Sequence, residues 1–231
     1  MTSSQLANAN MRPPSEVVSH YLEAIYYIRA EGEIVRSARL ADWLSVSRPT
    51  VTVALRRMIR DGMIRLTASK EIHLTRRGLT AAEAIVRRHR IMERWLNDGL
   101  GLDWVTADLE AERLEHAISE VVEKKLYQAL GRPTTCPHGN PIPGHSTMRA
   151  DERRLSTLKP GEVATVSRIS EVAQREAPPL LQYLHERGLH PGRRIKVLAV
   201  DEVGRTMQLR ATRVLTLSYE TATKLSVVKT P

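Results

Sequence analysis

Thiols and long apolar runs are nearly absent from this 231-residue chain. Its one cysteine, Cys136, has no second thiol to pair with, which excludes an internal disulfide and a thiolate zinc cluster. Any metal site must therefore use His, Asp and Glu. No stretch of about 18 apolar residues offers a membrane span, and residues 1–14 lack the apolar core of a signal peptide. We expect a cytoplasmic protein without a membrane partner.

Positive charge is in excess. The chain has 35 Lys and Arg against 26 Asp and Glu, a formal net charge of +9, and this favours a polyanionic partner. Between Arg48 and Arg77 there are eight basic residues and only two acidic ones, Asp61 and Glu71. The excess lies where a DNA-binding protein would meet phosphates.

Helix signals in the first 77 residues have the order of a helix-turn-helix. A helix follows Ser15, a short one spans 37–44, and Ser47 caps a third that has proline in its first turn. Two short apolar runs, 63–66 and 71–74, then flank a polar turn and predict a hairpin. A hairpin after a recognition helix is a wing, so residues 1–77 are predicted to be a winged-helix DNA-binding domain.

The rest of the chain predicts a helical domain and a small β domain. Amphipathic helices at about 79–97 and 106–130 predict that 78–144 is a helical dimerisation domain, because their apolar stripes need a partner. Residues 131–144 are rich in Pro and Gly, and the polar stretch 145–159 behind them is predicted to be a flexible linker. Short β-rich runs then predict a small barrel over 160–231. The fold class is mainly α with a small β domain.

Carboxylates and imidazoles recur at helical spacing. Glu112, Glu115 and His116 stand at i, i+3 and i+4, which places them on one face of a helix. Three further pairs share such spacing: His20 with Glu23, His89 with Glu93, and Asp108 with Glu112. Oxygen and nitrogen donors of this kind suit Mn²⁺ or Fe²⁺.

Two other classes of protein are open at this point. A metal-dependent hydrolase would explain the ligands, but not the wing or the basic stretch. The sequence also shows no nucleophile with an adjacent base, no phosphate-binding glycine loop and no His-Glu-x-x-His motif, so we expect no enzyme. A winged-helix regulator that needs no metal is the second alternative, and operator affinity independent of metal would favour it.

Several motifs make the chain resemble the diphtheria-toxin-repressor family of metalloregulators over nearly its full length. They are Ser47-x-Pro49-Thr50-Val51, Arg57-Met58-x-x-Asp61-Gly62, Arg88-His89-Arg90, Glu115-His116-x-x-Ser119 and, most specific, Pro137-His138-Gly139-Asn140-Pro141-Ile142-Pro143-Gly144. The resemblance implies a homodimeric repressor that binds double-stranded operator DNA and controls metal-homeostasis genes. It also implies a C-terminal SH3-like (FeoA-like) domain.

The resemblance further implies a ligand set for Mn²⁺, with Fe²⁺ as the alternative. The matching positions are His20, Glu23, His89, Glu93, Asp108, Glu112, Glu115, His116 and Glu176. Glu112 and Glu23 match the manganese branch, because the iron branch has Cys at the position of Glu112. His20 departs from both branches and leaves the choice of metal open. Pro179 falls where the family has a glutamine ligand. Cys136 and His138 lack clustered partners and are interpreted as spectators.

The predicted DNA contacts lie on the third helix and the wing. Pro49, Thr50 and Thr52 stand near the helix start, where base edges are met. Phosphate contacts are assigned to Arg48, Arg56, Arg57, Arg60 and Lys70. Metal would join the first helix to the helical domain and select a DNA-competent arrangement.

Overall fold

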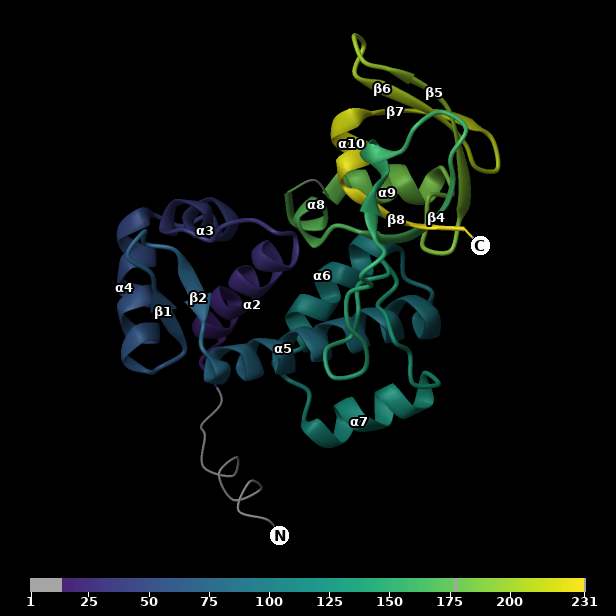
Figure 1. The fold of residues 1–231 in the computed structure, drawn as a ribbon. Coiled ribbons are helices and arrows are strands. Elements are labelled where there is room, and N and C mark those ends of the chain that lie inside the picture. Colours follow the sequence, from purple (N-terminus) through teal and green to yellow (C-terminus); the bar gives the residue numbers. More distant parts are fainter. Residues whose placement is uncertain (1–13, 177, 231) are drawn as a thin grey trace. The chain divides into compact units, whose positions relative to one another are not determined.

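The structure, a computed structural model, describes residues 14–176 and 178–230 (Figure 1). The chain divides into two compact units, Met1–Ile85 and Val86–Pro231. Each unit is described by itself. Among the described residues no helix has both the length and the apolar character needed to cross a membrane.

The first unit has the predicted helix-turn-helix and wing. Its elements are α2 (Glu16–Ala30), α3 (Ser37–Leu44), α4 (Arg48–Arg60), β1 (Ile64–Leu66) and β2 (Ile72–Leu74). The helices pack around a core that includes Leu22, Ile25, Leu40 and Met58, none of which is exposed. The two strands pair antiparallel, with Ile64 opposite Leu74.

Helix α4 begins and faces the core for reasons visible in its sequence. The Ser47 hydroxyl accepts a hydrogen bond from the Thr50 amide at 3.3 Å and caps the helix, while Pro49 stands in the first turn, where no amide is needed. Val51, Leu55 and Met58 recur at helical spacing and are buried. The remaining face of α4 is therefore free to carry polar and basic side chains.

Helices open the second unit. Helix α5 (Arg76–Arg94) enters from the first unit, passes into a π-helical turn (Trp95–Gly99), and is followed by α6 (Trp104–Leu114) and α7 (Glu120–Ala129). The single helix expected over 106–130 is wrong, because the chain breaks between α6 and α7. The Ser119 hydroxyl accepts from the Val122 amide and starts a new helix.

The Pro- and Gly-rich segment 131–144 is packed. Arg94 donates to the carbonyls of Thr135 and Cys136, at 2.9 and 3.1 Å, and the Cys136 amide donates to the Asn140 carbonyl. The Asn140 side-chain amide donates to the Ile169 carbonyl at 2.9 Å. Side-chain and backbone hydrogen bonds thus hold the segment between α5 and β4.

A six-stranded antiparallel sheet of order β3-β8-β4-β5-β6-β7 forms the C-terminal part. Its strands are β3 (Arg153–Arg154), β4 (Val163–Ile169), β5 (Arg194–Asp201), β6 (Thr206–Arg210), β7 (Val214–Ser218) and β8 (Leu225–Lys229). The helices beside it are α8 (Glu171–Glu176), α9 (Pro178–Glu186) and α10 (Tyr219–Thr223). Leu155, Val197, Leu209 and Leu225 lie in its core.

Two features of this sheet differ from the sequence expectation. It begins at Arg153, inside the stretch expected to be a linker. Within the described ranges its edge strands β3 and β7 do not pair with each other, so the sheet is open rather than a closed barrel.

Candidate metal centre and nucleic-acid interface

His89 on α5 lies between two carboxylates of the α6 region. Its Nδ1 donates to Glu115 Oε2 at 2.8 Å, and its Nε2 lies 3.4 Å from Asp108 Oδ1. Burial by itself would lower the pKa of His89, but its hydrogen bonds to Asp108 and Glu115 outweigh burial and raise that pKa well above the ordinary value. Without metal, this buried pocket already holds a positive charge between two acids.

Glu93, one turn after His89, is the carboxylate common to two donor groups. One group joins it to His89 and Asp108, and the other to Cys136 and His138. Within each group the candidate ligand atoms lie within 4.8 Å of one another. Burial alone would raise the pKa of Glu93, yet the neighbouring His138 lowers it to about 2. The contact with His138 therefore favours the charged form of the Glu93 carboxylate.

Cys136 and His138 are the functional candidates that the sequence interpretation dismissed. Both are buried beside Glu93, and the His138 Nδ1 contacts Glu93 Oε1. The His138 ring packs edge-on against Trp104, with centroids 5.0 Å apart. Burial, and then the charges of Glu93 and Glu171, raise the pKa of the Cys136 thiol well above its usual value. The available signal was the Cys-x-His spacing at the start of the most specific motif, since Cys136 stands directly before Pro137.

Contacts from α5 and β4 position this loop. Arg90 is almost completely buried, pairs with Glu171 at 2.6 Å and donates to the Pro141 carbonyl. Gly139 has φ +86°, and a Cβ there would lie 2.0 Å from the Ser167 carbonyl oxygen. Burial raises the pKa of Glu171 despite Arg90. The loop therefore presents Cys136 and His138 to Glu93 from a fixed backbone.

The other predicted ligands are distributed as follows. Glu112 lies on α6, Glu115 caps that helix and is fully buried, and His116 follows with its Nε2 3.3 Å from Glu115 Oε1. His20 and Glu23 lie one turn apart on α2, in the first unit. Glu176 belongs to α8, and its side chain lies outside the described residues.

These donors fit a divalent transition metal. Within the described part of the chain, the His138 Nε2 and Glu115 Oε1 are buried without a hydrogen-bond partner. Buried polar atoms left without a partner are costly, so a ligand that satisfies them is favoured. Carboxylate and imidazole ligands suit Mn²⁺ and Fe²⁺, whereas the Cys136 thiol adds a softer donor.

The predicted DNA-contact residues are all exposed on α4 and on the wing of the first unit. They are Arg48, Pro49, Thr50, Thr52, Arg56, Arg57, Arg60 and Lys70. Arg60 and Arg57 lie 3.3 and 3.7 Å from Asp61, and the Thr52 hydroxyl donates to the Arg48 carbonyl. Cations thus cover the outer face of α4, while Lys70 stands at the wing turn with φ +59°.

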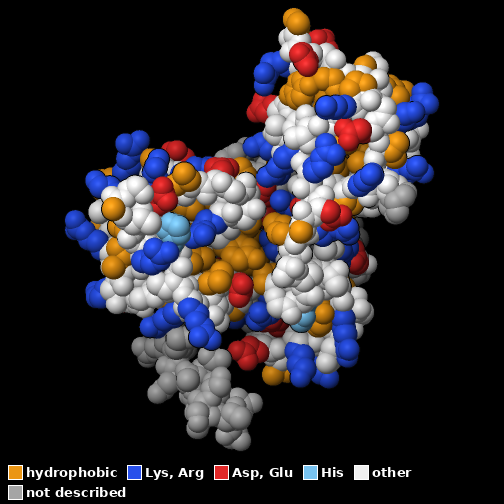
Figure 2. Space-filling model, viewed as in Figure 1, with side chains coloured by type: hydrophobic (Ala, Val, Ile, Leu, Met, Phe, Trp, Pro, Cys, Tyr) orange, Lys and Arg blue, Asp and Glu red, His pale blue; other side chains and the backbone are white. Residues whose placement is uncertain are grey.

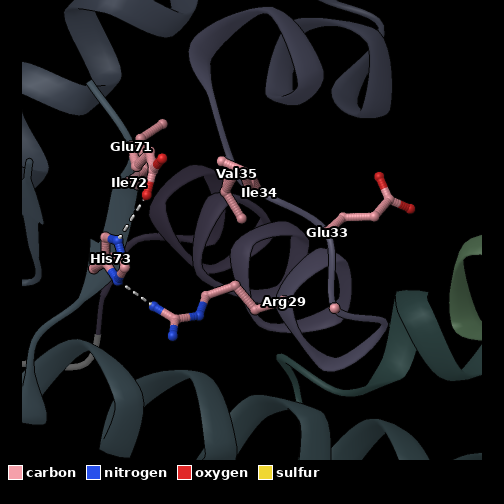
Figure 3. Close-up of a pocket in the computed structure, with 8 residues that line it drawn as sticks. Arg29, Glu33, Ile34, Val35, Glu71, Ile72 and His73 are labelled. Carbon is pink, nitrogen blue, oxygen red and sulfur yellow. Dashed lines mark hydrogen bonds and ion pairs between the residues drawn. The ribbon is translucent and has the colours of Figure 1, made fainter. Parts of the chain in front are cut away.

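Polar contacts tie the wing to α2 around a cavity of about 230 Å³ (Figure 3). Arg29 of α2 donates to His73 Nδ1 at 2.8 Å. His73 Nε2 in turn lies 3.7 Å from Glu71, and the Ile72 amide donates to the Val35 carbonyl at 2.9 Å. The position of strand β2 therefore depends on α2, the helix that carries His20 and Glu23.

Three family models together match most of the chain. The iron-dependent repressor N-terminal DNA-binding domain matches residues 15–71, and the iron-dependent repressor metal-binding and dimerisation domain matches 75–144. The FeoA domain matches 153–229.

Individual relatives agree with these models. The iron-dependent repressor IdeR of Mycobacterium tuberculosis is 37% identical over 220 residues, 90% of this chain and 95% of that protein. The diphtheria toxin repressor of Corynebacterium glutamicum is 32% identical over 206 residues, 85% and 89% of the two chains.

Solved structures share the fold. A manganese-dependent transcriptional repressor in complex with manganese superposes with a TM-score of 0.83 at 30% identity, covering 92% of this chain and all of the other. IdeR of T. acidophilum gives 0.76 at 26% identity, covering 95% and 100%. The winged helix, the buried cluster of potential metal ligands and the β domain together define a metal-dependent DNA-binding transcriptional repressor. The chain belongs to the iron-dependent (diphtheria toxin) repressor family.

Proposed function

We propose that operator binding by this chain is switched by Mn²⁺ or Fe²⁺ held at two neighbouring sites. In the first site, Glu112, Glu115 and His116 act with His20 and Glu23. In the second site, the proposed ligands are His89, Glu93, Asp108, Cys136 and His138. The observation that carries the proposal is Glu93, a buried anion within ligand distance of two separate groups of donors.

The choice of metal follows from the donors. The first site has only oxygen and nitrogen ligands, which suit Mn²⁺, and its carboxylates supply the negative charge that this weak binder needs. The second site includes Cys136, whose sulfur favours Fe²⁺ or another softer ion. We propose Mn²⁺ as the ion of the first site, with Fe²⁺ as its alternative, and a second site that accepts the softer ion.

The switch depends on charge and on helix α2. A bound divalent cation supplies the positive charge that lets Glu23, Glu112 and Glu115 share one site. Because Glu23 lies on α2, fixing that side chain also fixes the helix from which Arg29 holds the wing through His73. Metal binding thereby shifts the population towards one arrangement of the DNA-binding surface. The size of this shift is set by the difference in metal affinity between the two states.

We further propose that the functional unit is a homodimer formed through the helical part. Val121 and Val122 on α7 are 70% and 44% exposed, and Leu109 on α6 is 49% exposed, an apolar surface that a second copy would bury. We retain the division into a winged-helix domain (1–77), a helical domain (78–144) and a C-terminal SH3-like domain, whose open sheet begins at Arg153.

The test is operator binding by the full chain, stripped with chelator and titrated anaerobically with Mn²⁺, Fe²⁺ and Zn²⁺. The operator is first selected from a random duplex pool with the metal-loaded protein. We expect tight binding only with metal, and activation by Mn²⁺ or Fe²⁺ even though Zn²⁺ is generally the tighter binder at such donors. Equal operator affinity in chelator and in saturating metal would overturn the proposal in favour of a metal-independent regulator.

A further inference from the structure

Most of the net charge of the chain lies in its C-terminal part. Residues 153–229 contain 14 Lys and Arg against 7 Asp and Glu, a net charge of +7 out of +9 for the whole chain. Residues 15–71, which match the DNA-binding model, contain 9 against 7. The β domain is thus more basic than the domain that reads DNA, and nothing in the metal switch uses this charge. Figure 2 shows Lys and Arg side chains spread over the surface of this domain.

Three of these cations share the outer face of β5 and β6. Lys196 and Arg210 are directly opposite each other in the antiparallel register, and Arg194 stands two residues before Lys196 on the same face. All three are exposed, while the intervening Ile195 and Val197 point into the core. We call Arg194, Lys196 and Arg210 the basic face.

Like charges directly opposite each other across a strand pair are destabilising. The cross-strand neighbours offer no compensation, since Arg194 faces Thr165, Lys196 faces Val163 and Arg210 faces Val214. In the part of the chain that the structure describes, none of these three side chains makes a hydrogen bond or ion pair. The fold therefore keeps a repulsive arrangement that an external anion would relieve.

Carboxylates close to the basic face are engaged elsewhere. Glu162, at the start of β4, pairs with Arg153 at 3.1 Å and accepts from the Lys159 amide at 2.5 Å. Asp201, at the end of β5, accepts from the Gly204 amide at 2.7 Å. The face is left positive as well as exposed.

We propose that the basic face is a second, sequence-independent contact with duplex DNA, made through backbone phosphates. The proposal rests on the DNA-binding function of the chain. Phosphates at regular spacing match a row of cations on a flat sheet surface, and such contacts add affinity without reading bases. Once the first unit holds its operator, the basic face meets flanking DNA at a high effective concentration.

The test compares the metal-saturated full chain with the triple variant R194Q/K196Q/R210Q. The control triple R187Q/R205Q/K229Q removes the same charge from the same domain, away from the basic face. Binding to an operator duplex with long flanks, and to a random duplex of equal length, is measured against salt concentration. Each lost phosphate contact lowers the slope of log affinity against log salt by about 0.9. We expect the slope to fall by about 2 to 3 per protomer on both duplexes for R194Q/K196Q/R210Q and to change by less than about 1 for the control.

A second readout uses the repulsion itself. K196Q removes one partner of the opposed pair, so we expect its Tm to rise by a few degrees while its DNA affinity falls. Equal slopes for the two triple variants, or an unchanged slope for R194Q/K196Q/R210Q, overturn the basic face as a DNA contact. Failure of the unmodified chain to bind any duplex at any metal concentration overturns the DNA-binding function, and with it this proposal.

Discussion

Glu115 accepts a hydrogen bond from His89, and this single 2.8 Å contact joins the two proposed metal sites. Because Glu115 holds Nδ1 of His89, the Nε2 atom of the same ring faces Asp108. His89 and Asp108 form one donor group with Glu93. Carboxylates that hold the second nitrogen of a histidine ligand commonly fix its orientation and tautomer. Glu115 can thus serve as a ligand in one site and as a positioning residue in the other, which makes the two sites interdependent.

Glu93→Gln should impair the switch without changing the shape of the side chain. It removes the anion shared by His89 and His138, so we expect the metal concentration for half-maximal operator binding to rise at least ten-fold. Metal affinity is measured by competition with a chelator, and DNA binding by fluorescence anisotropy. Glu83→Gln, a carboxyl loss earlier on the same helix and outside both donor groups, is the control. Identical activation curves for E93Q and E83Q would show that Glu93 does not contribute to the metal centre.

Cys136→Ser should change metal preference rather than abolish the response. Replacing sulfur by a hydroxyl removes the soft donor, so Fe²⁺ and Co²⁺ should lose affinity relative to Mn²⁺. Co²⁺ titration offers a direct readout, because a cobalt–thiolate bond gives an ultraviolet charge-transfer band that the serine variant must lack. A Co²⁺ spectrum shared by both proteins would show that Cys136 is no ligand.

His20→Asp should raise the response to Mn²⁺ relative to Fe²⁺. The substitution exchanges a neutral nitrogen donor on α2 for an anionic oxygen, the ligand type that Mn²⁺ prefers. His20→Ala provides the comparison and should weaken activation by both metals. Should His20→Ala leave metal affinity and metal-dependent DNA binding unchanged, the link from α2 to the metal rests on Glu23 alone.

Gly139→Ala should destabilise the second unit more than a matched glycine change. Both Gly139 and Gly161 have positive φ, at +86° and +90°, so alanine strains the backbone at each by about 1 kcal/mol. Only Gly139 adds a clash with the Ser167 carbonyl. We expect a total loss of about 2 to 4 kcal/mol for G139A, measured by urea unfolding, and an accompanying loss of metal affinity. Equal losses for G139A and G161A would contradict the packed loop.

Local signals in the sequence predicted the first unit well. Ser47 and the proline after it define the start of α4, and the residues of the short helix 37–44 are those of α3. The broken helix was missed because the apolar period continues through 115–119, where the Ser119 cap overrides it.

The metal centre was only partly predictable, because its second half is assembled by long-range contacts. Glu112, Glu115 and His116 were visible as candidates because they are close in sequence, but only Glu112 lies within α6, since Glu115 caps that helix and His116 follows it. Cys136 and His138 reach Glu93 only because the loop packs on α5 and β4 through Arg94 and Asn140. Helical periodicity carries no information about such a loop, so these two residues looked isolated.

The ion pair of Arg90 with Glu171 joins residues 81 positions apart, and this has a consequence for protein synthesis. Arg90, Glu93 and His89 leave the ribosome well before Asn140 gains Ile169 and Arg90 gains Glu171. In a nascent or prematurely terminated chain, Arg90 therefore lacks the counter-charge of Glu171. The loop that carries Cys136 and His138 also lacks the contact of Asn140 with Ile169. The proposed second metal site would therefore be assembled only after β4 and the start of α8 have been translated, while β5, β6, β7 and β8 are still to be made.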